Sequence, residues 1–437
     1  MSDFVYYGVM FAGVLGLAGM MFGQVKIPYL ALASGIAWGI IFIFHPHELA
    51  DSEAEETAWK TFELIAFLIP VMTIIEGGVH YGMMDAVLRV INTTHKRTLM
   101  FIVGIMSFIL SALLDNITAS IIMSILVVQL MYSKEDRLKF IVLIIAGANA
   151  GGVPSAIGNT TSILLWVGGQ LSIKVMFTAL ILPTIVYMLV IFGFFWPQMD
   201  GNVERPVPDQ LDTEQLDQDK LFHLPVWQQW GILFLVLTCI GIIIGGKVFF
   251  HIPPWVGAML SLGFWGLFTW RVNKVKGDHF LEERSVRSVL KHIDHNTVFM
   301  FMLLLPLISA MGHVGILGDL ATKIVAGVQD FAGEEAVVPG VAIVLGLISS
   351  VVPNTPLVAA SQSMFSYEQD HLFWEMLNYT TGVGGALLPM GTSAGMILMS
   401  RFRGTLTVKS YVKKAFVPLL LAFFAGLAVL YVQKFFM

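Results

Sequence analysis

Cysteine is almost absent from this chain. Cys239 is the single cysteine among 437 residues, so no disulfide can form within the chain and no thiolate metal centre can be built. Charge is scarce as well, because Asp, Glu, Lys and Arg make up 13% of the residues, whereas soluble domains carry about 25%. Together with 56% hydrophobic residues and a mean hydropathy of +0.78, this composition predicts a polytopic membrane protein.

Several functional signatures are missing too. The amino-terminal sequence Met1-Ser2-Asp3 lacks the basic segment with which a cleavable signal peptide begins. The apolar segments contain no His-Glu-x-x-His helix, no paired aspartates and no Ser–His arrangement, one of which an intramembrane hydrolase would need. No clustered basic face indicates nucleic acid. We therefore expect no enzymatic activity, no cofactor and no nucleic-acid partner, and a lipid bilayer as the surroundings.

Long apolar runs are what the chain has in abundance. Crossing a bilayer as a helix takes about 20 residues, and ten segments reach or approach that length, two of them interrupted by polar and glycine-rich stretches. The ten segments are 5–22, 29–44, 59–75, 140–166 (interrupted), 175–196, 230–249, 255–270, 298–312, 378–399 (interrupted) and 417–432. The predicted fold class is therefore an all-α polytopic membrane protein.

A polar stretch, residues 111–120, stands between two shorter apolar arms. It contains Asp115, Asn116 and Thr118, and the arms cover residues 99–113 and 121–131. Each arm has about 15 residues or fewer, too short to cross the bilayer alone, so we predict a re-entrant hairpin over about 98–132 whose broken backbone is covered by protein or water. An ionisable group deep in a bilayer marks a functional site. A loop tip at the membrane surface is the alternative.

The two sides of the acidic, proline-containing stretch 198–229 resemble each other. A second pair of short arms, 338–352 and 357–365, flanks Pro353-Asn354-Thr355-Pro356, so Asn354 corresponds to Asn116. Residues 151–160 align without a gap to 384–393, and residues 78–85 match 312–319. Three matches in the same order indicate an internal repeat. We predict an amino-terminal repeat over 1–197, a cytoplasmic linker over 198–229, and a carboxy-terminal repeat over 230–437 with its hairpin at about 337–366.

The placement of basic residues predicts the orientation of the two hairpins. The first hairpin lies between His95-Lys96-Arg97 and Lys134, whereas no Lys or Arg occurs between Lys323 and Arg401. Under the positive-inside rule the first hairpin opens from the cytoplasm and the second from the opposite face. Each repeat then has five transmembrane helices, one of them broken, and one re-entrant hairpin. The odd number of spans inverts the second repeat and leaves both termini outside the cytoplasm.

The four interruptions, two hairpin tips and two helix breaks, are expected to meet near the midplane, where inverted-repeat transporters bind their cargo. Half-helices beginning just after Asn159 and Thr392 would present positive dipole ends, and unwound backbone together with Asn, Thr and Ser oxygens suits Na⁺. Asp115 is the ionisable group among them and would bind Na⁺ or a proton in competition. The candidate cation- and proton-binding residues in these interruptions are Asp115, Asn116, Thr118, Asn159, Thr160, Thr161, Ser162, Asn354, Thr355, Thr392 and Ser393, with Na⁺ held at Asp115, Asn116 and Asn354.

The runs 114–118, 148–152 and 155–166 resemble those of NhaD-type Na⁺/H⁺ antiporters, of the superfamily that also holds arsenite pumps and sodium–dicarboxylate carriers. The resemblance implies that Na⁺ or Li⁺ is expelled in exchange for H⁺ across a bacterial inner membrane by alternating access. It also implies a homodimer. Matched motif by motif, it implicates Asp115, Asn116, Thr118, Asn149, Thr161 and Ser162, with Asn354 and Ser349 or Ser350 from the second half.

One residue departs from the antiporter motif. Asn159 stands where the motif usually has an aspartate after Ile-Gly, and an asparagine there resembles the anion-carrying relatives. A Na⁺-coupled symporter for a carboxylate or an inorganic anion therefore stays open as the alternative. Asp115 would repel an anion in the same cavity, and the four interruptions contain no Arg or Lys. A midplane carboxylate without a balancing cation favours cation exchange.

Residues outside the four interruptions are weaker candidates. Glu76 and His80 follow the third span and could line a proton route or sense pH, because histidine titrates near neutrality; the alternative places both at the membrane surface. Asp319 is expected to cap or solvate a helix at the interface, as is Asp85 near the amphipathic stretch 83–91. Glu135 and its neighbour Asp136 are assigned to a charged loop.

Overall fold

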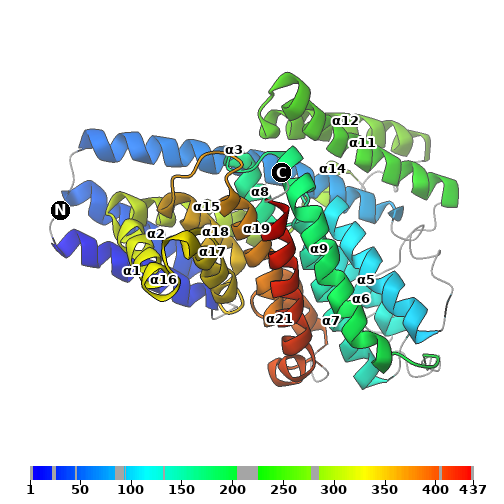
Figure 1. The fold of residues 1–437 in the computed structure, drawn as a ribbon. Helices are drawn as coiled ribbons and strands as arrows, with labels where there is room; N and C mark the ends of the chain where they lie inside the picture. The colour runs from blue at the N-terminus through cyan, green and yellow to red at the C-terminus, as the bar shows by residue number, and fades with distance from the viewer. Residues whose placement is uncertain are drawn as a thin grey trace. The chain divides into compact units, whose positions relative to one another are not determined.

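The computed structural model describes residues 3–21, 26–44, 47–83, 93, 95–130, 133–203, 225–276, 285–402 and 406–434. These residues form helices, and the one β feature found among them is an isolated bridge between His95 and Asn202 (Figure 1). The helices of the first half are α1 (Asp3–Met21), α2 (Lys26–Phe44), α3 (His47–His80), α5 (Lys96–Leu113), α6 (Asn116–Leu130), α7 (Lys134–Gly152), α8 (Thr160–Val167), α9 (Ile173–Phe195) and the 3₁₀ helix η1 (Trp196–Gln198). Those of the second half are α11 (Val226–Phe250), α12 (Pro254–Lys276), α14 (Val286–Val289), α15 (His295–His313), α16 (Ile316–Ala332), η3 (Glu334–Ala336), α17 (Val337–Ile348), α18 (Asn354–Met364), α19 (Leu372–Gly384), η4 (Gly385–Leu387), α20 (Ser393–Arg401) and α21 (Val408–Gln433).

The helices confirm a polytopic membrane protein. Among the described residues, eight helices are long and apolar enough to cross a membrane, namely α1, α2, α3, α5, α9, α11, α15 and α21. The predicted interruptions are also present, because the first broken span divides into α7 and α8 and the second into α19, η4 and α20. The apolar runs of the sequence therefore locate the helices well.

The chain divides into two compact units. The first consists of Met1–Asn92 and Asp212–Val314, and the second of Thr93–Leu211 and Gly315–Met437. Each unit thus takes one stretch from each half of the sequence. Within the first unit, α1 packs on α2 and α11 on α12, while α3 contacts α12 and α15 contacts α2.

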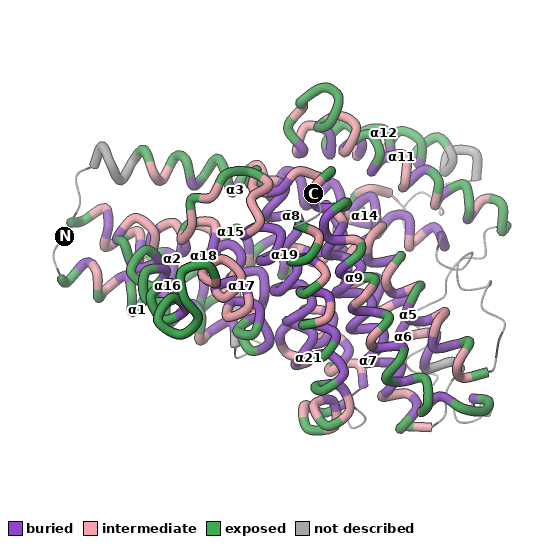
Figure 2. The backbone as a smooth tube through the Cα atoms, in the orientation of Figure 1, coloured by how far each residue is buried: buried purple, intermediate pink, exposed green. Residues whose placement is uncertain are grey.

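The second unit contains both hairpins and both broken helices. Helix α5 packs against α7 and α17 against α19, so each hairpin lies along the broken helix of its own half. The second arm of each hairpin contacts the short half-helix of the opposite half, because α6 contacts α20 and α18 contacts α8. Helices α9 and α21 lie side by side (Figure 1). Helix α7 is buried along most of its length, from Phe140 to Gly152, and lies among the buried segments of Figure 2.

The first hairpin arm is longer than expected from its sequence. Helix α5 has 18 residues, about 27 Å at ~1.5 Å per residue, because it begins at Lys96 rather than after the basic residues. The prediction of about 15 residues for this arm was therefore wrong. The other arms are short, as expected: α6 has 15 residues, α17 has 12 and α18 has 11.

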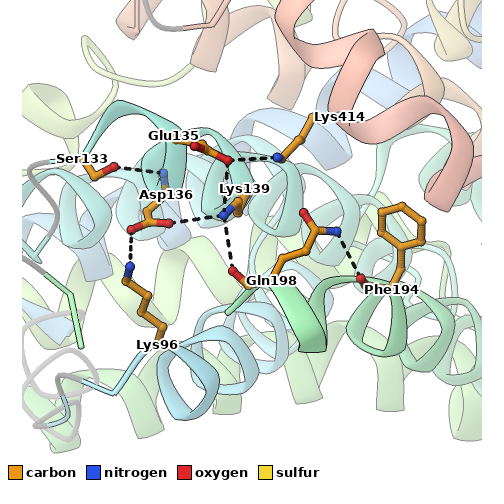
Figure 3. Close-up of polar contacts among 8 residues, drawn as sticks. All are labelled: Lys96, Ser133, Glu135, Asp136, Lys139, Phe194, Gln198 and Lys414. Atoms are coloured by element: carbon orange, nitrogen blue, oxygen red, sulfur yellow. Dashed lines mark hydrogen bonds and ion pairs between the residues drawn. The ribbon is translucent and has the colours of Figure 1, made fainter. Parts of the chain in front are cut away.

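Glu135 and Asp136 lie in the first turn of α7 and not in a loop, which corrects the expectation for both. The Asp136 carboxylate accepts from Lys96 at 2.7 Å and from Lys139 at 3.4 Å, and Glu135 accepts from Lys414 at 3.1 Å (Figure 3). The hydrogen bond from Lys414, helped by the charge of Lys139, lowers the pKa of Glu135. This network joins the ends of α5, α7 and α21.

Two further expectations concern the connecting segments. Residues 226–229, assigned to the linker, are the first turn of α11, and 204–224 lie outside the described residues. Asp319 lies in the first turn of α16, after the amino-terminal cap position Gly315. Asp85 and the remainder of its amphipathic stretch, 84–91, also lie outside the described residues.

Candidate functional site

The two helix breaks are built in similar ways. Helix α7 ends at Gly152 and α8 begins at Thr160, with Asn159 as the amino-terminal cap residue of α8. In the second half, α20 begins at Ser393, and the Thr392 hydroxyl caps it by accepting from the Gly395 N–H at 3.2 Å. Half-helices that begin after Asn159 and Thr392 were predicted from the sequence, and both are confirmed.

Each break packs directly against the hairpin tip of its own half, and glycine makes this approach possible. A Cβ on Gly158 would lie 2.5 Å from the Ser111 carbonyl oxygen, and one on Gly391 would lie 2.5 Å from the Ser349 carbonyl oxygen. Backbone atoms cannot yield as a flexible side chain can, so only glycine fits at either position. In each half of the chain, the helix break and the hairpin tip are therefore in close contact.

Buried oxygen atoms crowd around Ser162, at the start of α8. Its hydroxyl oxygen lies 3.1 Å from the Gly152 carbonyl, 3.2 Å from the Val153 carbonyl and 3.1 Å from the Asn378 side-chain oxygen. Thr161 donates to the same Asn378 oxygen at 3.4 Å, and the Asn378 amide donates to Val153 at 3.0 Å. We call these five residues the Asn378 cluster.

The Asn378 cluster is dense in acceptor oxygens. The Ser162 hydroxyl carries one proton but lies within hydrogen-bond distance of three acceptor oxygens. The side chains of Thr161, Ser162 and Asn378 are fully buried. Carbonyl and hydroxyl oxygens around an unwound stretch are the ligands with which transporters coordinate Na⁺. The cluster has the chemistry of a monovalent-cation site.

A second cluster joins the first hairpin tip to the second helix break. The Asn116 amide donates to the Asn149 side-chain oxygen at 3.5 Å, and the Asn149 amide lies 2.8 Å from the Ile145 carbonyl and 3.3 Å from the Thr392 hydroxyl. Asn116, Asn149 and Thr392 are all buried. We call these three residues the Asn149 cluster. The two clusters are reciprocal, because Asn149 in α7 reaches the start of α20 while Asn378 in α19 reaches the start of α8.

Two threonines connect the first helix break to the second hairpin tip. The hydroxyl oxygens of Thr160 and Thr355 lie 2.7 Å apart, and each also approaches the side-chain oxygen of the asparagine before it, Asn159 at 3.4 Å and Asn354 at 3.5 Å. Both asparagines are buried. Their amide nitrogens have no hydrogen-bond partner within the described part of the chain, and an unsatisfied buried donor costs about 1–3 kcal/mol. Such a cost points to a ligand.

Asp115 stands at the tip of the first hairpin, immediately before α6. Its half-buried carboxylate accepts from the Thr118 backbone N–H and from the Thr118 hydroxyl, each at 2.7 Å. Asp294 and Thr297 form the same pair of bonds at the start of α15. Thr118 therefore orients the Asp115 carboxylate, and the helix amino terminus favours a negative charge there.

The remaining predicted residues lie at the edges of this site or outside it. Ser349 and Ser350 donate to backbone carbonyls of α17, Gly346 and Leu347, each at 2.7 Å, and Ser393 is half-buried at the start of α20. Glu76 and His80 belong to the first unit, at the end of α3. There His80 lies 3.6 Å from the Glu76 carboxylate and its ring contacts that of His292 at 4.7 Å.

The sequence-based prediction missed Asn378. Its hydrogen-bond partners, Thr161, Ser162 and Val153, are more than 200 positions away in the sequence, so no local motif joins them. One signal was available, because Asn378 is a polar residue that begins an interrupted apolar span.

Broken helices, hairpin tips and buried oxygen clusters in a membrane-spanning helical protein define a membrane transporter. The sequence matches the CitMHS family, described as "Citrate transporter", over residues 6–377, and the chain belongs to this family.

Relatives confirm the resemblance to NhaD-type proteins. "Sodium/proton antiporter 1" of Arabidopsis thaliana is 28% identical over 400 residues, which cover 90% of this chain and 66% of that protein, just under two thirds of its length. "Na(+)/H(+) antiporter NhaD" of Vibrio cholerae is 27% identical over 414 residues, covering 87% and 81%. Among solved structures, the Alcanivorax borkumensis YdaH transporter superposes with a TM-score of 0.52 at 10% identity, covering 86% and 85%. This last likeness concerns the fold alone.

Proposed function

We propose that this chain exchanges Na⁺ or Li⁺ for H⁺ across a bacterial inner membrane, by alternating access and as a homodimer. The observation that carries the proposal is the density of buried acceptor oxygens in the Asn378 cluster, where Ser162 alone approaches three of them. The relatives named as sodium/proton antiporters support it over most of the length of the chain.

Asp115 supplies the charge on which exchange depends. Its neighbour Asn116 belongs to the Asn149 cluster, so the carboxylate lies next to neutral oxygen ligands at the hairpin tip. When Asp115 is ionised, it and these oxygens favour Na⁺. A proton on Asp115 removes the charge, and Na⁺ then leaves. Competition between the two cargoes for one carboxylate is what couples their movement in opposite directions.

An inverted repeat would expose this site alternately to the two sides. Close backbone approaches support the repeat, because Gly151 packs on the Phe108 carbonyl in the first half and Gly384 packs on the Gly346 carbonyl in the second. The reciprocal contacts of α6 with α20 and of α18 with α8 support it as well.

Fluorescence of a pH-sensitive dye in everted membrane vesicles tests the exchange. Na⁺ added to acidified vesicles should restore the fluorescence with the wild-type chain, and Asp115→Asn should abolish the response. Asp294→Asn is the matched control, since it removes a carboxylate with the same two bonds to a threonine in the other unit. Wild-type exchange in Asp115→Asn, or equal loss in both variants, would contradict the proposal.

One observation favours a second candidate function. The buried amide nitrogens of Asn159 and Asn354 have no partner within the described residues and could donate to a carboxylate, which fits the description of the family as citrate transporters. Na⁺-coupled symport of a carboxylate would appear as uptake of labelled citrate or succinate into proteoliposomes that requires Na⁺. If protein that exchanges Na⁺ for H⁺ shows no Na⁺-dependent uptake of citrate or succinate, the symport function is excluded.

A further inference from the structure

A buried ion pair lies at the start of α19, outside the clusters described above. The Glu375 side chain is 1% exposed, and one of its oxygens accepts from Lys434 at 2.8 Å. Lys434 follows the last residue of α21, and its side chain is 35% exposed. The second carboxylate oxygen of Glu375 is buried without a hydrogen-bond partner in the described part of the chain.

The helices around α19 offer few other charges. It packs against α7, α8, α9, α17, α18, α21 and η4, and α8, α17, α18 and η4 contain no ionisable residue. The other ionisable residues are Tyr379 on α19 itself, Lys174 and Tyr187 on α9, Lys409, Tyr411, Lys413, Lys414 and Tyr431 on α21, and Lys134, Glu135, Asp136, Arg137 and Lys139 on α7. Those of α7 lie in its first two turns, and Lys174 is exposed. His371, the amino-terminal cap residue of α19, lies one turn before Glu375, and its Nδ1 accepts from the Phe373 N–H at 3.1 Å. The ion pair with Glu375 is formed by Lys434.

A gain in folding stability does not by itself explain why the ion pair between Glu375 and Lys434 is present. Well-packed apolar residues often stabilise a protein as much as a buried ion pair does or more, because removing two charges from water is costly. In this pair, only one of the two Glu375 carboxylate oxygens has a hydrogen-bond partner among the described residues. In the ion-pair network at the start of α7, Asp136 uses one oxygen for Lys96 and the other for Lys139, whereas Glu375 leaves one oxygen open.

The position of Glu375 relates it to the cation site. It precedes Asn378 by three residues on α19, and residues three apart are neighbours on a helix surface. Asn378 in turn bonds to Thr161 and Ser162, just after Asn159. Asn159 is where the antiporter motif has a carboxylate and this chain does not. The first half thus lacks this acid, while the second half has a buried acid, Glu375, three residues before Asn378.

We propose that Glu375 is a second proton-carrying carboxylate of the exchange cycle, acting in place of the aspartate absent at position 159. The inference rests on the proposed Na⁺/H⁺ exchange. A proton from external water adds to the open oxygen of Glu375 and gives the neutral acid, while Lys434 remains an ammonium ion and turns to solvent. When the proton leaves on the other side, the ion pair forms again. With Asp115, two protons then move for each Na⁺.

The ratio of protons to Na⁺ tests this role. The full-length protein is reconstituted in liposomes with an internal pH dye, and the membrane potential at which net flux vanishes is measured for fixed Na⁺ and pH gradients. The wild type is expected to give two protons per Na⁺ and a flux that depends on voltage. Glu375→Gln keeps the size of the side chain and an acceptor for Lys434 but cannot carry a proton, so its ratio should fall to one and the voltage dependence should vanish. Glu375→Asp should restore the ratio of two.

Further variants separate this role from a structural one. Asp136→Asn removes the matched buried acid at the start of α7 and should leave the ratio at two even where it lowers stability. Lys434→Gln should move the optimum of activity to higher pH, because the unbalanced carboxylate keeps its proton longer; this variant decides the question if Glu375→Gln does not fold. A ratio unchanged in Glu375→Gln, or an unchanged pH profile in Lys434→Gln, would overturn the proposal. A wild type without Na⁺-driven proton flux would instead overturn the proposed function itself.

Discussion

Asn159 is the residue at which this chain differs most from the antiporter motif that it resembles. It is fully buried, its oxygen accepts from Thr160 at 3.4 Å, and its nitrogen has no partner in the described residues. In Asn159→Asp a second oxygen and a negative charge replace that nitrogen, beside the ligands of the Asn378 cluster. We expect the apparent affinity for Na⁺ to rise about tenfold, which corresponds to about 1.4 kcal/mol.

Initial rates of exchange at a series of Na⁺ concentrations measure this effect. Asn159→Ala is the control, since it removes both polar atoms without adding charge, and its apparent affinity should fall. An affinity for Na⁺ that is the same in Asn159→Asp and the wild type would place the cation away from the first helix break. Thermal unfolding of the same variant should show a cost, because a buried charge without Na⁺ has no balancing cation.

Individual residues differ in how far the sequence predicts them. Asn159 and Thr392 are recognisable as helix starts, because glycine before a short polar side chain is typical of a helix boundary. Asn378 could not be assigned in this way, since its role depends on Thr161 and Ser162, to which only the folded chain brings it. Glu375 was missed for the same reason, because its partner Lys434 follows α21.

At the scale of elements, the contact between each hairpin tip and each helix break depends on one glycine. A Cβ on Gly158 would lie 2.5 Å from the Ser111 carbonyl and 2.8 Å from the Gly152 Cα. Gly158→Ala should therefore destabilise the protein by about 1–3 kcal/mol, the usual cost of overpacking a tight contact, and reduce exchange strongly because the break is displaced.

Thermal unfolding of the purified protein and vesicle exchange assays measure the two effects. Gly193→Ala is the matched control, because Gly193 lies in α9, where a Cβ would meet no atom of the described residues within 4 Å, and alanine is the better helix former. Equal melting temperatures for Gly158→Ala and Gly193→Ala would show that the contact between the hairpin tip and the helix break leaves room for a methyl group, contrary to this prediction.

The lengths of the elements were harder to predict than their existence. Charged residues next to an apolar run indicate the end of a span, and Lys96 was placed outside the hairpin for that reason. In the structure Lys96 begins α5, because its ammonium group forms an ion pair with the Asp136 carboxylate of α7 at 2.7 Å.

The pKa of the neighbouring Glu135 is lowered by Lys414 and Lys139. The contribution of Glu135 to the stability of this network is therefore present at neutral pH and is lost as the pH falls through that lowered pKa.

At the scale of the whole molecule, the two units do not follow the two halves of the sequence. Each unit combines a stretch from before the linker with one from after it, and both candidate clusters lie in the second unit. The length of the apolar runs predicts which segments are helices, but it carries no information about which helices group together. The order of the internal matches predicts the repeat, and the reciprocal contacts of α6, α8, α18 and α20 agree with it.

The predicted inversion of the second repeat can be tested by site-specific labelling, for which the chain is well suited. Its single cysteine, Cys239, is buried in α11, so Cys239→Ser gives a background without thiols. In that background Lys134→Cys, at the start of α7, should react with a membrane-impermeant maleimide only in everted vesicles, because the first hairpin opens from the cytoplasm. Glu368→Cys, before α19, should react only on intact cells. Both positions are exposed in the structure. Labelling of both cysteines from the same side would mean that the repeats are parallel, and alternating access by two inverted halves would then have no structural basis.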